Sequence, residues 1–134
     1  MSTLYLTHNQ TSDYRIVLPK TADAATTNAA NELSAYLAKI TGVSLPVITD
    51  EIPSAEHEII VGIARNAEDV IPDIASLGED GFVIRALDEK LYLLGASGRG
   101  NLYAVYDFLE KFAGCRFYAS YYEKIPQTDL LTVP

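Results

Sequence analysis

One continuous stretch in the last third of the sequence constrains the fold most, because only a very short turn separates an expected strand from an expected helix. Residues 90–96 (KLYLLGA) are apolar enough for a buried strand, and residues 98–112 (GRGNLYAVYDFLEKF) carry apolar side chains at helical spacing. Gly95, Gly98 and Gly100 stand at the junction. A strand, a glycine-containing turn and a helix in this order are typical of a phosphate-binding loop, or of a tight corner.

The glycine spacing matches neither of the common phosphate-binding motifs. No Lys-Ser or Lys-Thr pair follows Gly100, and Tyr103 stands where the dinucleotide-binding pattern requires its third glycine. The preceding strand also belongs to an expected hairpin rather than to a βαβ unit. We therefore interpret the glycines as allowing a tight backbone turn, with Ser97 as the helix cap. The alternative, in which Arg99 contacts a ligand or a partner, stays open.

The whole sequence predicts the order β-β-α-β-β-(α)-β-β-α, followed by an extended tail from Tyr121 to Pro134. The first long helix covers residues 22–41; Thr21 or Asp23 can cap its start, and Gly42 can close its end. Its apolar stripe is Ala29, Leu33, Tyr36, Leu37 and Ile40, and that of the second helix is Leu102, Val105, Tyr106, Leu109 and Phe112. Gly114 is the expected end of the second helix. A short helix is also expected within residues 66–77.

The remaining periodic segments predict strands at residues 3–7, 14–19, 45–49, 57–63, 81–87 and 90–96. The first two strands are expected to pair as a hairpin, and so are the last two, across a turn at Asp88 and Glu89. The continuous apolar run Ile59–Val61 is typical of a central strand, whereas Pro46 favours an edge position for its strand.

These elements favour an α+β fold, in which a mixed β-sheet carries two long helices packed on one face. Such a sheet has a second face that also needs cover. We expect this cover to come from outside the chain, such as from a neighbouring domain.

Length and composition limit the classes of function. The 134 residues suit one domain spanning residues 1–134, and the formal net charge of −8 makes nucleic acid an unfavourable partner. No apolar run approaches the ~20 residues that span a bilayer, so no membrane span is expected. The single cysteine, Cys115, cannot form an internal disulfide. The N-terminal residues carry no recognisable export signal.

The residue types used in catalysis and metal binding do not form a recognisable site. His8 and His57 are far apart and match no metal-binding spacing. Cys115 follows a helix C-terminus, which disfavours a reactive thiolate. The adjacent acidic pairs, such as Asp50 with Glu51, fall at turns and are interpreted as solvated charges rather than a hydrolytic pair. We expect no catalytic residue, no metal and no cofactor.

Aromatic composition is more informative, because the chain has nine tyrosines and no tryptophan. Tyr118, Tyr121 and Tyr122 cluster after the second helix. Tyrosine rings can stack on sugars, but they serve equally at a surface between domains. We favour the interdomain interpretation, and we name Arg99, Tyr118, Tyr121 and Tyr122 as candidate ligand or interdomain contacts.

Several stretches, in a fixed order, carry a family resemblance. They are residues 29–42, Ile59–Gly62, Gly81–Ile84, residues 94–110 with Gly114–Tyr118, and Glu123–Pro126. Together they resemble the N-terminal domain of α-glucuronidases, and they are similar to the non-catalytic second domain of β-hexosaminidases. The resemblance covers nearly the whole chain.

The resemblance implies a domain that precedes a (β/α)8 barrel, and in these families the barrel carries the catalytic carboxylates. The function it implies is a non-catalytic N-terminal accessory domain of a polysaccharide-degrading glycoside hydrolase. Its partner would be the downstream catalytic barrel of the same polypeptide, and an oligosaccharide could be a further ligand. A secreted, periplasmic or cell-surface location in a bacterium is also implied. The alternatives are a free-standing carbohydrate-binding module and, ranked last, a small stand-alone enzyme.

Overall fold

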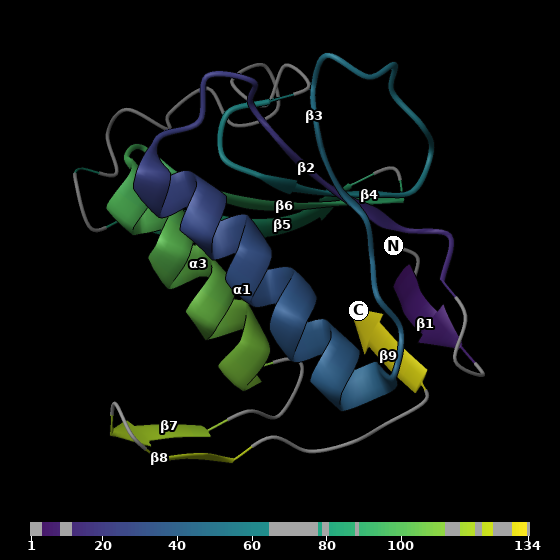
Figure 1. The fold of residues 1–134 in the computed structure, drawn as a ribbon, viewed down its shortest axis with the longest axis vertical. Helices are drawn as coiled ribbons and strands as arrows, with labels where there is room; N and C mark the ends of the chain where they lie inside the picture. The colour runs from purple at the N-terminus through teal and green to yellow at the C-terminus, as the bar shows by residue number, and fades with distance from the viewer. Residues whose placement is uncertain are drawn as a thin grey trace.

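The structure is a computed structural model that describes residues 4–8, 12–64, 78, 81–87, 89–111, 116–119, 122–124 and 130–133, arranged as in Figure 1. The helices are α1 (Ala24–Thr41) and α3 (Gly98–Lys111). The strands are β1 (Leu4–His8), β2 (Arg15–Leu18), β3 (Val47–Thr49), β4 (Glu58–Val61), β5 (Phe82–Leu87), β6 (Lys90–Gly95), β7 (Arg116–Ala119), β8 (Tyr122–Lys124) and β9 (Leu130–Val133). The short helix expected within residues 66–77 lies outside the described residues, as do Phe112, Gly114 and Cys115.

A five-stranded sheet forms the centre, in the order β3-β2-β4-β6-β5. The first four of these strands are parallel, and β5 runs antiparallel to β6. All four residues of β4 are buried at the middle of the sheet, as its continuous apolar run predicted. The predicted edge position of β3 and the predicted hairpin of β5 and β6 are also confirmed.

The two helices lie side by side on one face of this sheet (Figure 1), which confirms the predicted α+β class. Helix α1 begins at Asp23, whose carboxylate accepts the N–H of Thr26, and ends at Gly42 in the left-handed region with φ 77°. The shared core draws on both helices and on alternate residues of the parallel strands. Its largest fully buried side chains are Ile16, Leu33, Leu37, Ile40, Ile59, Leu91, Leu93 and Phe108.

The buried stripe of α3 differs in part from the prediction. Val105 and Leu109 are buried as expected, but Leu102 and Tyr106 are only half-buried at the edge of the core. Phe108, which was not in the predicted stripe, is fully buried. The buried stripe is shifted toward Phe108. The reason is that α3 packs against α1 as well as against the sheet.

The second face of the sheet is also buried, so the expectation that it needs cover from outside the chain was wrong. The side chains on this face alternate along the strands with those that meet the helices. They are Val17, Ile60, Tyr92 and Leu94, together with Ala64, and none is more than 5% exposed. Both faces of the central strands are therefore part of a hydrophobic core.

The predicted hairpin between the first two strands is also wrong. β2 has parallel partners on both sides, β3 and β4, so no edge of it is open to β1. β1 instead pairs antiparallel with β9, with Leu4 opposite Val133 and His8 opposite Leu130. The first and last described strands therefore lie together in a separate two-stranded ribbon (Figure 1). β7 and β8 form a second ribbon. β8 and β9 fall within the predicted extended tail, whereas β7 precedes it.

A buried carboxylate joins the amino ends of three parallel strands. Glu58, whose side chain has no exposed surface, accepts from the guanidinium of Arg15 at 2.9 and 3.0 Å and from the ammonium of Lys90 at 3.3 Å. These three residues are the first of β4, β2 and β6. Burial by itself would raise the pKa of Glu58, but hydrogen bonds from Arg15, the Ala55 N–H and Lys90 outweigh burial and lower the pKa.

Glu58→Gln tests this arrangement. Because it removes one partner of a buried ionic network, we expect it to reduce the free energy of unfolding by about 3–5 kcal/mol, as measured by urea denaturation at neutral pH. The exposed neighbour Glu56→Gln is the control and should stay within about 0.5 kcal/mol of the wild type. An equal, small effect of both substitutions would contradict a structural role for the buried carboxylate.

The pH dependence of stability gives an independent check. The folded-state pKa of Glu58 is lowered, so its contribution is fully present above the ordinary value of 4.5 and is lost as pH falls through the folded value. We therefore expect unfolding free energy to fall on acidification below about pH 4.5, and to fall less steeply in Glu58→Gln. Identical slopes in the two proteins would contradict this.

Candidate functional site

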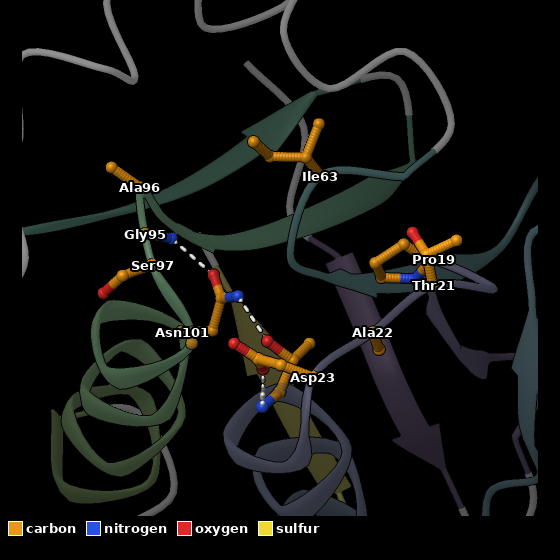
Figure 2. Close-up of a pocket in the computed structure, with 11 residues that line it drawn as sticks. Pro19, Thr21, Ala22, Asp23, Ile63, Gly95, Ala96, Ser97 and Asn101 are labelled. Carbon is orange, nitrogen blue, oxygen red and sulfur yellow. Dashed lines mark hydrogen bonds between the residues drawn. The ribbon is translucent and has the colours of Figure 1, made fainter.

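An open depression lies at the carboxyl ends of the parallel strands and has a volume of about 410 Å³. We call it the carboxyl-edge depression. It is bordered by the segments that follow β2, β4 and β6 and by the first turns of both helices (Figure 2). Its lining residues are Pro19, Thr21, Ala22, Asp23, Thr26, Ile63, Gly95, Ala96, Ser97, Gly98 and Asn101.

The connections of the sheet explain why a depression forms here. From β2 the chain passes through α1 to β3 on one side, whereas the strands that follow β4 in sequence, β5 and β6, lie on the other side. The connections after the neighbouring strands β2 and β4 therefore leave in opposite directions, and a space opens between them at the carboxyl ends of the two strands. In open sheets of this kind, ligands bind in the crevice at this switch point.

A chain of hydrogen bonds ties the three sides of the depression together. The Gly95 N–H at the end of β6 donates to Oδ1 of Asn101 at 2.6 Å, and Nδ2 of Asn101 donates to Oγ1 of Thr26 at 2.9 Å (Figure 2). The Thr26 N–H in turn donates to the carboxylate of Asp23 at 2.8 Å. Asn101 and Thr26 are buried, so the amide and hydroxyl are satisfied inside the protein. The chain fixes α1 and α3 relative to β6.

Asp23 supplies the negative charge of the depression. Its carboxylate caps α1, accepting the Thr26 N–H at 2.8 Å. Hydrogen bonds from the Thr26 side chain and backbone lower the pKa of Asp23, so it is ionised at neutral pH. The residue is exposed, and its oxygens also lie against Gly98 at the start of α3. A fixed anion therefore stands beside the first turns of both helices.

Two of the glycines at the strand-to-helix junction, Gly95 and Gly98, stand where a Cβ would meet close contacts. A Cβ on Gly95 would lie 2.5 Å from the backbone of Gly100, and a Cβ on Gly98 would lie 2.4 and 2.5 Å from the oxygens of Asp23. None of the three junction glycines has a positive φ. The predicted tight corner is confirmed, but its reason is the lack of a side chain rather than a special backbone conformation.

The predicted cap of α3 is confirmed as well. The Ser97 hydroxyl oxygen accepts the N–H of Gly100 at 3.1 Å, and the Ser97 carbonyl accepts the N–H of Asn101 at 3.0 Å. The Ser97 side chain thus caps one N–H at the start of α3, as the Asp23 side chain does at the start of α1. A phosphate would have to compete with both caps and with the Asp23 charge, which argues against a phosphate-binding loop.

The four candidate contact residues do not gather in one place. Arg99 is exposed on the first turn of α3, next to the depression but not among its lining residues. Tyr118 belongs to β7 and Tyr122 to β8, in the ribbon beyond the other end of α3 (Figure 1). Tyr121 lies outside the described residues. Their roles as contacts stay predictions, now divided between two regions.

Sequence reasoning missed Asn101 and Thr26, and it assigned Asp23 only a capping role. Thr26 lies on the polar face of the predicted first helix, and Asn101 adjoins the predicted stripe of the second, so neither was expected in a buried contact. A polar residue directly after the Gly98-Arg99-Gly100 corner was the available signal.

Among the described residues, no group of three His, Cys, Asp or Glu side chains could hold a metal ion. No described helix is long and apolar enough to cross a membrane.

Gly98→Ala tests the corner. Although alanine favours a helix, the added Cβ would collide with Asp23 and Ala25, and we expect a net loss of about 1–3 kcal/mol in unfolding free energy. In an Asp23→Gly background, where the cap changes by only a few tenths of a kcal/mol, part of this loss should disappear. Thermal or urea unfolding of the wild type, the two single variants and the double variant gives the coupling free energy between positions 98 and 23. Additive effects would contradict the close contact.

Comparisons with known proteins agree on one family. A family model described as "Glycosyl hydrolase family 67 N-terminus" matches residues 4–108. Two proteins named "Probable alpha-glucuronidase A", from Aspergillus oryzae and Aspergillus flavus, are each 28% identical over 104 residues. These matches cover 76% of this chain but only 12% of each relative. The resemblance to the N-terminal domain of α-glucuronidases is thereby confirmed.

Solved structures share the fold at low sequence identity. One is a GH115 4-O-methyl-α-glucuronidase with specificity for decorated arabinogalactans, with a TM-score of 0.55 and 19% identity over 80% of this chain and 14% of that chain. Another is a GH138 enzyme targeting pectin rhamnogalacturonan II, with a TM-score of 0.53 and 13% identity over 74% of this chain and 10% of that chain. At these identities the likeness concerns the fold alone.

Proposed function

The chain belongs to the family of the glycosyl hydrolase family 67 N-terminus, and from this premise we propose that it is a non-catalytic accessory domain of a carbohydrate-degrading glycoside hydrolase. It would support a (β/α)8 catalytic barrel further along the same polypeptide. One observation carries the proposal: the match covers 12% of the length of proteins named as α-glucuronidases. Most of each relative, and room for its catalytic part, lies elsewhere.

The carboxylates with shifted pKa values support a non-catalytic role. Glycoside hydrolysis uses two carboxyl groups on either side of the scissile bond. Asp23 caps a helix at the carboxyl edge of the sheet, whereas Glu58 is buried between two cations at the amino edge. Both pKa values are lowered, which is opposite to the raised pKa of a general acid. These two groups therefore cannot act as a hydrolytic pair.

The size of the native polypeptide tests the proposal most directly. We expect an antibody raised against the 134-residue chain to detect, in the source cells, a polypeptide several times larger than 14.6 kDa. The isolated chain should not hydrolyse an aryl α-glucuronide, whereas the longer polypeptide should. A band at the size of this chain would overturn the accessory role and favour a free-standing carbohydrate-binding module.

We further propose that Arg99 and the tyrosines Tyr118, Tyr121 and Tyr122 lie at the contact with the barrel. Hydrogen exchange should then be slower at the first turn of α3 and at the β7–β8 ribbon in the longer polypeptide than in the isolated chain. The buried strand β4 is the internal control, because its protection does not depend on a neighbouring domain. Equal exchange at both regions in the two proteins would exclude this contact.

A further inference from the structure

We propose that the carboxyl-edge depression binds a neutral sugar ring through its hydroxyl groups, with Asp23 as the main hydrogen-bond acceptor. The choice of a sugar rests on the proposed function, whereas the chemistry of the site rests on the depression itself. This site differs from the tyrosine cluster considered from the sequence. Its volume of about 410 Å³ falls within the usual range for small-molecule sites, roughly 300–1,000 Å³.

The first argument concerns hydrogen-bonding capacity. An ionised carboxylate offers about four acceptor positions, and the backbone N–H of Thr26 occupies one of those on Asp23. Acceptor capacity therefore remains on an exposed group at the wall of the depression. A ligand that carries several O–H donors suits this capacity. The Thr21 and Ser97 hydroxyls border the same space from two other segments (Figure 2).

The second argument concerns the apolar part of the wall. Ile63 is 43% exposed, and Ala96, another lining residue, is exposed as well. Figure 2 places Ile63 across the depression from Asp23, with Ser97 and Ala96 on one side and Pro19 and Thr21 on the other. A sugar ring has C–H groups on its faces and hydroxyls around its rim, so it can meet both kinds of wall at once.

The third argument concerns charge. Asp23 and Ser97 each cap one N–H at the start of a helix, and the Asp23 carboxylate is ionised at neutral pH. A ligand carboxylate or phosphate would meet this negative charge at close range, in a chain of net charge −8. The depression should therefore select neutral sugars over uronic acids. This would direct it to an uncharged part of a polysaccharide rather than to a glucuronate group.

The test uses the 134-residue chain labelled for amide NMR. The probes are the neutral sugars glucose, galactose, xylose and arabinose, with glucuronic acid as the charged counterpart of glucose. We expect at least one neutral sugar to shift the amides of Ile63, Gly98 and Asn101 with roughly millimolar affinity, and glucuronic acid to bind more weakly than glucose. No shift at these amides with any neutral sugar, at the highest soluble concentration, would overturn the proposal.

Asp23→Asn is the discriminating variant, since asparagine caps a helix about as well as aspartate. Loss of the charged acceptor should weaken binding of the neutral sugar about five- to tenfold and should abolish discrimination against glucuronic acid. Asp13→Asn is the matched control: it makes the same charge change at an exposed position before β2, at the opposite edge of the sheet. Equal effects of the two variants would reject a specific role for Asp23.

Sugar binding at the depression and the accessory role in the hydrolase can fail independently of each other. Sugar binding by a chain whose native polypeptide is no larger would uphold the depression and overturn that accessory role. A large native polypeptide with no sugar binding at the depression would uphold the accessory role and overturn the sugar site.

Discussion

The amide of Asn101 is the contact on which the arrangement of this domain most depends. It accepts from Gly95 at the end of β6 and donates to Thr26 on α1, although it belongs to α3. One buried side chain thus fixes the two helices to the sheet and to each other. Gly95 and Gly98 have no room for a Cβ because strand, helices and cap approach so closely at this point.

The two edges of the sheet have opposite characters. At the amino edge, Glu58 is enclosed between Arg15 and Lys90 and joins three parallel strands through a buried charge network. At the carboxyl edge, the strands separate and leave an open depression with an exposed carboxylate. A closed charge network thus lies where the strands begin, whereas the open space lies where they end. This division is common in sheets with parallel strands, because connections diverge at the carboxyl ends.

The same corner explains why a strand-glycine-helix sequence does not make this domain a phosphate binder. In a phosphate-binding loop, free N–H groups at a helix start meet the ligand. Here Ser97 engages such groups on α3, and Asp23 brings a negative charge to the position next to Gly98.

Local patterns in the sequence determined the two long helices, the strands of the central sheet, the Gly42 and Ser97 caps and the central place of β4, because each depends on side chains close together in the chain. The tertiary structure alone decided contacts between distant segments. It placed β1 against β9 because both sides of β2 were already occupied. It buried Asn101 and Glu58 because their partners lie on other elements, and it made Asp23, which caps α1, part of the wall of a depression. No periodicity within one segment carries that information.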